Sequence, residues 1–219
     1  MPVDLQHTFA PATLRSLMEG LLVTLEVAAS AIVLSFVFGI ILGILRYTKL
    51  PVLSQLAVLY IEVMRNLPLL LIIFFGYFGL RDMGIELPVT MAAITGLTVF
   101  TSALIAEIVR SGLNSVEKGQ IEAARAQGFT YSQTLWYIIL PQGLKRMIPP
   151  LVSQFITLVK DTSLAVVISL EEIMHNAQIV YNKYVNATIP LLILVAFIYF
   201  TINYSLSRVS RYLEKRLAG

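Results

Sequence analysis

Long runs of apolar residues alternate with short polar segments along this chain of 219 residues. A helix needs about 20 mostly apolar residues to cross a hydrocarbon core of about 30 Å. Five runs are long enough, and we predict five transmembrane spans, at 20–45, 52–80, 88–109, 150–170 and 189–206. These runs are too continuous for the alternating strands of a membrane barrel. The pattern therefore predicts an all-α polytopic helical bundle in which residues 1–219 form a single transmembrane domain.

Composition supports placement in a lipid bilayer. Hydrophobic residues make up 57% of the chain and charged residues only 13%, whereas a soluble domain is about 25% charged. The absence of cysteine excludes disulfides and thiolate chemistry. The formal net charge of +3 does not indicate nucleic-acid binding, because the placement of the basic residues explains it better.

Lysine and arginine are distributed unevenly between the two sides of the predicted bundle. The connecting segments on one side hold eleven of them and those on the other side hold three. Because an excess of Lys and Arg marks cytoplasmic loops, the N-terminus is predicted outside and the C-terminus in the cytoplasm. The longest cytoplasmic loop is then 110–149. The eleven are Arg46, Lys49, Arg110, Lys118, Arg125, Lys145, Arg146, Arg208, Arg211, Lys215 and Arg216, and the three are Arg15, Arg81 and Lys183.

This loop contains the stretch EAARAQGFTYSQTLWYIILP, residues 122–141. Good helix formers precede Gly128, which suits the left-handed conformation that ends a helix. Thr130 and Gln133 fit a capping box that starts a second helix, and Pro141 is expected to end it. We therefore predict a helix–Gly–helix hairpin, with alanines on its first arm and bulky apolar groups on its second. A simple interfacial hairpin is an equal alternative on these features.

The same stretch resembles the EAA loop in the membrane subunits of ABC importers. The match runs Glu-Ala-Ala, three residues, Gly, nine residues, Ile-x-Leu-Pro, at Glu122, Ala123, Ala124, Gly128, Ile138, Leu140 and Pro141. The stretches YIEVMRNLPLLL and LPQGLKRMIPPLVSQFITLVKDTSL are similar to the polar amino acid permease branch of that family. One departure is RNLP at 65–68, where the branch often has Arg-Gly-Thr-Pro, and it is expected to alter local helix geometry.

The resemblance implies a type I ABC importer-like permease subunit, multi-pass in the bacterial cytoplasmic (inner) membrane, that imports polar amino acids. It implies that the loop is a coupling helix, seated in a groove on a cytoplasmic ATPase. The implied partners are a second permease subunit, identical or paralogous, two cytoplasmic ABC ATPase subunits and an extracytoplasmic amino acid-binding protein. ATP and Mg would be bound by the ATPase. The chain itself has no phosphate-binding loop and is predicted not to be an enzyme.

Two adjacent charges, Lys160 and Asp161, fall near the middle of the fourth predicted span. A charge in a span costs about 2.5–3.5 kcal/mol, so each is a functional candidate. Adjacent helix positions point about 100° apart, and a mutual pair is therefore not expected. With Thr162 and Ser163 these side chains could bind an amino acid on its path, or they could hold helices together through ion pairs.

Two further pairs have i,i+3 spacing. Glu62 and Arg65 are expected to pair within one helix that Pro68 kinks, and either to line the substrate path or to serve structure alone, with structure favoured. Glu107 and Arg110 are expected to anchor the cytoplasmic end of the third span.

Other features carry less weight. Gly39 and Gly43 form a close-packing motif that suits internal packing and dimer contact equally well. His7 and His175 are far apart and predicted to be solvated, so a metal site lacks ligands. The alternative function is an ion-coupled secondary amino acid transporter, but no inverted repeat supports it.

Overall fold

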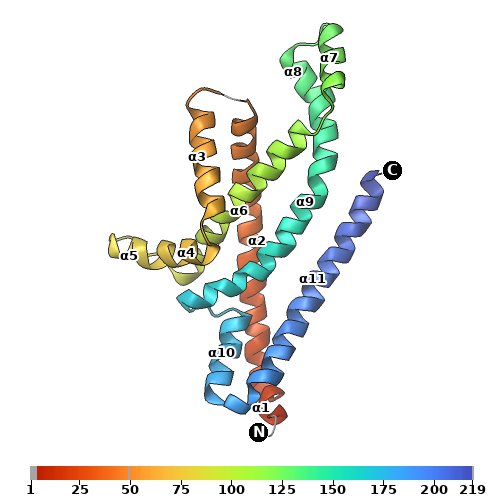
Figure 1. The fold of residues 1–219 in the computed structure, drawn as a ribbon. Helices are drawn as coiled ribbons and strands as arrows, with labels where there is room; N and C mark the ends of the chain where they lie inside the picture. Colours follow the sequence, from red (N-terminus) through yellow and green to blue (C-terminus); the bar gives the residue numbers. More distant parts are fainter. Residues whose placement is uncertain (1–3, 49, 219) are drawn as a thin grey trace. The chain divides into compact units, whose positions relative to one another are not determined.

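The computed structural model describes residues 4–48 and 50–218, and all regular secondary structure in these residues is helical (Figure 1). Four continuous helical stretches are long and apolar enough to cross a membrane, and a broken pair raises the number to five. The four are Pro11–Thr48, Val89–Asn114, Tyr131–Ile168 and Val185–Tyr212, and the pair joins Leu53–Asn66 with Leu69–Asp82. The predicted all-α fold class is confirmed.

The helices follow one another with short connections. The α-helices are α1 (Leu5–Thr8), α2 (Pro11–Thr48), α3 (Leu53–Asn66), α4 (Leu69–Phe74), α5 (Leu80–Asp82), α6 (Val89–Asn114), α7 (Lys118–Ala126), α8 (Tyr131–Thr134), α9 (Leu140–Asp161), α10 (Ile173–Lys183) and α11 (Thr188–Ala218). Two π-helical segments, η1 (Phe75–Gly79) and η2 (Leu135–Ile139), and two 3₁₀ segments, η3 (Thr162–Ile168) and η4 (Val185–Ala187), complete the order.

Helix length exceeds predicted span length. α2 has 38 residues, which corresponds to about 57 Å at about 1.5 Å per residue. Hydropathy identifies only the part that suits lipid, whereas a helix continues through polar residues whose backbone bonds remain satisfied. The membrane boundaries and the orientation of the termini stay predictions. Of the residues behind the orientation, Lys49 and the side chains of Lys215 and Arg216 lie outside the described residues.

The second predicted span is broken at Leu67 and Pro68. α3 ends at Asn66 and α4 begins at Leu69, with Pro68 at φ −62° and ψ 130°. Proline has no N–H to donate and pushes the preceding residue toward extended backbone. The Asn66 side chain also donates to the Glu62 carbonyl at 2.7 Å, a local bond of the kind that competes with helix continuation. A full break therefore replaces the predicted kink.

The predicted helix end at Pro141 is wrong. The helix that starts at Tyr131 continues past Pro141, and the π-helical turn η2 lies just before the proline. In η2 the Leu140 N–H donates to the Leu135 carbonyl, five residues back. The wider turn accommodates a ring that would clash with the carbonyl four residues back in a regular helix. The second arm of the hairpin and the fourth apolar stretch are therefore one continuous helix.

The chain forms two compact units, each assembled from three separate segments. Unit 1 comprises Met1–Val33, Leu67–Phe100 and Ile156–Leu206, and unit 2 comprises Leu34–Asn66, Thr101–Phe155 and Ser207–Gly219. Each unit has its own buried apolar side chains.

Unit 1 contains two apolar clusters. The larger includes Val27 of α2, Ile73 of α4 and Leu97 of α6, all fully buried. The smaller joins α2, α10 and α11 through residues such as Leu17 and Leu191. Each cluster draws on segments far apart in the sequence, so the unit can form only when those segments meet.

Unit 2 is packed around the second half of α6. Ile105, Val109 and Leu113 of that helix lie against Ile139 and Met147 of the hairpin and α9. These five side chains belong to one buried apolar core of unit 2, which also includes Val116 and Leu151.

Gly39 and Gly43 bring α2 directly against α6 in unit 2. A Cβ on Gly39 would lie 2.5 Å from Ile105 Cγ2, and one on Gly43 would lie 2.7 Å from Val109 Cβ and 2.8 Å from the Ala106 carbonyl oxygen. Of the two uses predicted for this motif, the structure assigns it to internal packing.

Candidate functional site

The predicted helix–Gly–helix hairpin is present as Lys118–Ile139, hereafter the hairpin (Figure 1). Gly128 has a φ of +89°, and the Gly128 and Phe129 N–H groups donate to the carbonyls of Arg125 and Ala124 at 3.0 and 3.2 Å. These two bonds define a Schellman motif, which favours glycine at the left-handed position. The hairpin turn thus follows from a local backbone requirement at Gly128.

The second arm of the hairpin starts at the predicted capping box. The Gln133 N–H donates to Thr130 Oγ1 at 3.3 Å, and the Thr130 N–H donates to Gln133 Oε1 at 2.8 Å. The base of the hairpin is closed by Gln142, whose Nε2 donates to Gln120 Oε1 at 2.6 Å. Sequence reasoning missed Gln120 and Gln142, because a contact between residues 22 positions apart leaves no local pattern.

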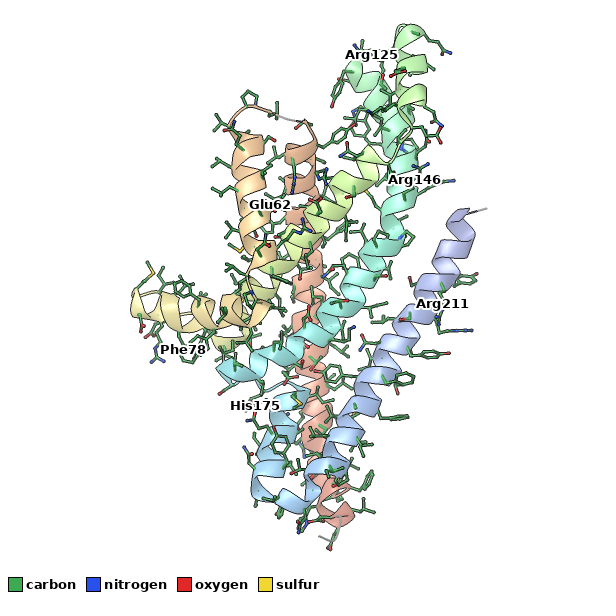
Figure 2. All side chains as sticks on the ribbon, viewed as in Figure 1. Glu62, Phe78, Arg125, Arg146, His175 and Arg211 are labelled. Carbon is green, nitrogen blue, oxygen red and sulfur yellow. The ribbon has the colours of Figure 1, made fainter. Side chains whose placement is uncertain are left out.

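The first arm presents part of the alanine face that was predicted. Glu122, Ala123 and Ala126 are exposed, and Arg125 lies at the tip of the hairpin (Figure 2). Ala124, however, is buried within its own unit. Adjacent helix positions point about 100° apart, so Ala124 can face its own unit while Ala123 faces outward. Within the part of the chain that the structure describes, Glu122 makes no ion pair.

The second arm exposes large aromatic side chains. Trp136 is 67% exposed and Tyr137 70% exposed, whereas Ile138 and Leu140 are half-buried and Ile139 is fully buried. Pro141 is exposed at the base. The π-helical register of η2 sets which of these side chains point outward, and no sequence signal predicted that register.

Lys160 and Asp161 lie at the end of α9, and Thr162 and Ser163 begin the 3₁₀ segment η3. Lys160 is exposed and Asp161 half-buried, and neither forms an ion pair with any described residue. The hydroxyls turn back to the local backbone: Thr162 donates to the Val159 carbonyl and Ser163 to that of Lys160, each at 2.8 Å. The two charges therefore remain available to an external group.

Five charged side chains of unit 2 form a second cluster, hereafter the arginine cluster, made of Arg46, Glu62, Arg65, Glu107 and Arg110. Arg46 donates to Glu107 Oε2 at 2.8 Å and to Glu62 Oε1 at 3.1 Å. Arg110 donates from Nε to Glu107 Oε1 at 3.0 Å, and its Nη2 contacts the same oxygen. Arg65 lies 3.7 Å from Glu107 Oε2.

This arrangement corrects one predicted pair and keeps the other. Glu62 pairs with Arg46 of α2, and Arg65 with Glu107 of α6, instead of with each other. Helix spacing allows an i,i+3 pair, but tertiary packing offered each side chain a partner on another helix. Glu107 and Arg110 pair as predicted. Since three arginines share two carboxylates, the cluster carries a formal excess of one positive charge.

Sequence reasoning also missed Glu172, a fully buried carboxylate in unit 1. Its Oε1 accepts the His175 N–H at 2.7 Å, which caps α10, and its Oε2 accepts the Tyr199 hydroxyl at 3.0 Å. Burial raises the pKa of this carboxyl, and the hydrogen bonds that the carboxylate accepts lower it in part. Asn176 of the same helix donates to the Ser16 carbonyl at 2.7 Å, so α10 is fixed to both α2 and α11.

The two histidines are less solvated than predicted. His7 stacks on Tyr184, with ring centroids 3.9 Å apart, and its Nδ1 lies 2.7 Å from Asp4 Oδ2. Hydrogen bonding to His7 lowers the pKa of Asp4. His175 is half-buried, and its Nδ1 is inaccessible to solvent.

These features define a class of protein: a multi-pass helical membrane protein with a preformed hairpin that presents an exposed glutamate and exposed aromatic rings. The chain belongs to the family described as the binding-protein-dependent transport system inner membrane component, which matches residues 7–219. It is the permease subunit of an ABC importer and not an enzyme, as the EAA-loop resemblance predicted.

Curated relatives match nearly the full length. The probable glutamine ABC transporter permease protein GlnP of Bacillus subtilis is 55% identical over 98% of this chain and 99% of that protein. The probable glutamine permease GlnM of the same organism is 44% identical over 91% of this chain and 92% of that protein. Two such permeases in one organism support a second permease subunit as a partner. The relatives give no support to the ion-coupled alternative.

Solved structures agree with this fold. The chain matches the crystal structure of an amino acid ABC transporter with histidines at a TM-score of 0.92 and 29% identity, over 99% of this chain and 100% of that one. A methionine ABC transporter, MetNI, in an inward-facing conformation matches at a TM-score of 0.72 and 24% identity, over 93% of this chain and 99% of that one. The latter supports the fold alone.

Proposed function

We propose that this permease imports a polar amino acid, with glutamine as the first candidate, across a bacterial cytoplasmic membrane. Glutamine is the substrate in the names of the relatives at 55% and 44% identity. The proposed complex contains a second permease subunit, two cytoplasmic ATPases that bind ATP and Mg, and an extracytoplasmic binding protein. The N-terminus lies outside and the hairpin in the cytoplasm, in keeping with the uneven distribution of Lys and Arg.

The hairpin is the observation that supports ATPase docking. A Cβ on Gly128 would meet nothing within 4 Å, and Glu122 is exposed without an intrachain ion pair in the described residues. A preformed surface that exposes a charge without an ion pair among the described residues suits a protein interface. Glu122, Ala123 and Gly128 contact the ATPase in this proposal, while Ala124, Ile138, Leu140 and Pro141 hold the hairpin in shape.

Lys160 and Asp161 are the proposed substrate contacts. A zwitterionic amino acid needs a cation for its carboxylate and an anion for its ammonium group. The absence of an ion pair to either residue within the described chain favours this role over that of holding helices together. Thr162 and Ser163 shape the backbone at this point. Glu62 and Arg65, as part of the arginine cluster of unit 2, are also proposed to contact the substrate.

Gly128→Asp is expected to uncouple transport from ATP hydrolysis. Within the chain the new side chain has open space, so the direct cost is the left-handed backbone conformation, about 1–2 kcal/mol. Any larger effect must come from a docked partner. We expect at least about a tenfold loss of transport-linked hydrolysis or of ATPase recovery with the complex, which corresponds to about 1.4 kcal/mol at the interface. The measurement is ATPase co-purification and hydrolysis in proteoliposomes.

Gly128→Asn is the matched control, because asparagine tolerates the left-handed conformation and carries no charge. We expect it to retain most of the complex. Normal complex recovery together with normal hydrolysis in the Asp variant would rule out the docking role.

Lys160→Ala is expected to weaken amino acid uptake without loss of assembly. Lys160 is exposed and makes no ion pair in the described residues, so its removal costs little folding energy. Loss of one charge-assisted contact to a carboxylate corresponds to about 1.5–3 kcal/mol, or roughly tenfold or more in substrate KM. Uptake of radiolabelled glutamine by proteoliposomes measures it, and Lys183→Ala serves as the control. Unchanged uptake kinetics would remove Lys160 from the path.

A further inference from the structure

Unit 2 contains a cavity of about 390 Å³ beside the arginine cluster, hereafter the arginine cavity. Pockets for small organic ligands have volumes of about 300–1,000 Å³. The polar residues that line the cavity are Arg65, Glu107, Ser111, Ser115, Arg146 and Gln154. The cavity is therefore large enough for an amino acid and offers both charged and neutral hydrogen-bonding groups.

Glu107 is the one carboxylate among the described lining residues of the cavity, and it is already engaged. Glu107 Oε1 accepts from Arg110, and its Oε2 accepts from Arg46 at 2.8 Å. Two arginines, Arg65 and Arg146, line the cavity against this one neutralised carboxylate. The field in the cavity is therefore positive and favours an anionic group.

Arg65 retains unused hydrogen-bonding capacity. Its ion pair with Glu107 has an N–O distance of 3.7 Å, longer than the 2.7–2.9 Å or so of a charge-assisted hydrogen bond. A guanidinium has about five N–H donors in a fixed planar fork. Arg65 can thus donate to a ligand without giving up a strong contact.

Two residues of α9, Arg146 and Gln154, also line the cavity. Arg146 donates from Nη1 to the Ser115 carbonyl, which anchors its guanidinium against the end of α6 (Figure 2). The Nε2 of Gln154 is buried and has no hydrogen-bond partner in the described residues. A buried donor without an acceptor is uncommon in native proteins and costs stability. Because that nitrogen is also inaccessible to solvent, it does not reach the cavity, and Gln154 contributes other atoms to the lining.

We propose that the arginine cavity binds the carboxylate of an amino acid through Arg65 and Arg146, as a second substrate site apart from Lys160 and Asp161. This inference rests on the proposed function. A planar carboxylate matches the guanidinium fork.

The apolar side of the cavity argues for an organic carboxylate over inorganic phosphate. Leu104, Ile108 and Pro150 line that side. They suit the carbon skeleton of an amino acid and offer nothing to the hydration shell of phosphate.

Equilibrium binding of radiolabelled L-glutamine tests the site in the purified complex of permease and ATPase, without nucleotide. The measurement is made in the Lys160→Ala background, so that glutamine held at the first proposed site contributes little. We expect saturable binding that L-glutamine amide, which lacks the carboxylate, displaces at least about tenfold less well than glutamine does. We expect inorganic phosphate not to compete. Equal competition by the amide, or full displacement by phosphate, would overturn the proposal.

Arg146→Gln tests the contact to the carboxylate. Glutamine binding should fall at least about tenfold, whereas Lys145→Gln, at the neighbouring exposed side chain, should bind as the background does. Unchanged binding in Arg146→Gln, or an equal loss in Lys145→Gln, would defeat the assignment.

The uptake assay keeps this test distinct from the proposed function. If the wild-type complex with its binding protein takes up no amino acid, the proposed function fails. If uptake is normal and the Arg146→Gln variant binds glutamine as the background does, only the second site fails.

Discussion

Gly43→Leu is expected to abolish folded protein. A Cβ at this position would already lie 2.7 Å from Val109 Cβ and 2.8 Å from the Ala106 carbonyl oxygen, which belongs to the backbone of α6. A leucine must therefore separate α2 from α6, and the core around Val109 loses its packing. Overpacking costs about 1–3 kcal/mol where neighbours can yield, and more where backbone blocks the space. Yield of monodisperse protein on size exclusion after detergent extraction is the measurement.

The control for this prediction is Gly76→Leu, because a Cβ on Gly76 would meet nothing within 4 Å. Gly76→Leu should give close to the wild-type yield. Gly43→Ala should give a yield between those of the wild type and Gly43→Leu. Equal yields from Gly43→Leu and Gly76→Leu would show that the α2–α6 contact does not limit folding.

Glu107→Gln is expected to be the most destabilising charge change in unit 2. Glu107 is the common partner of Arg46, Arg65 and Arg110. With Glu107 neutral, three arginines would share one remaining carboxylate. Removal of one partner from a buried pair costs about 3–5 kcal/mol, and the 19% exposure of the Glu107 side chain reduces this to about 2–3 kcal/mol. The thermal midpoint in detergent should fall by about 5–10 °C.

Glu19→Gln is the matched control, since it removes the same charge from an exposed pair. Arg15 and Glu19 are 83% and 61% exposed, and such pairs contribute less than about 1 kcal/mol. The effect at Glu107 should also persist in high salt, because partly buried charges are poorly screened. Equal midpoint shifts for the two variants would contradict a structural role for the arginine cluster.

Local sequence chemistry predicted the hairpin turn correctly. Gly128, Thr130 and Gln133 act through bonds to residues at most five positions away, so their pattern in the sequence carries the information. The helix end predicted at Pro141 was wrong, because the compensating π-helical turn at Leu135–Ile139 has no simple residue signature. The sequence shows that proline lacks an N–H donor, but it does not show that the turn before the proline is π-helical.

The charged residues show the opposite case. Their presence among apolar stretches marked Glu62, Arg65, Lys160 and Asp161 as candidates, yet the partners of Glu62 and Arg65 were predicted wrongly. Several partners were sterically possible for each, and only the packing of α2, α3 and α6 selected among them. On α9, the Nε2 of Gln154 is buried without an acceptor among the described residues, a fact that no spacing in the sequence conveys.

The sequence by itself determined that this protein is all-helical and multi-pass and carries a helix–Gly–helix hairpin, because apolar run length and local capping are properties of consecutive residues. Its resemblance to the EAA-loop family, and not those patterns, indicated a permease. Only the tertiary structure decided that Gly39 and Gly43 seat α2 on α6, that Ala124 is buried, and that the arginine cluster forms around Glu107 beside an open cavity. Those outcomes depend on which distant segments approach within a few ångströms, and steric fit and charge pairing are settled at that distance.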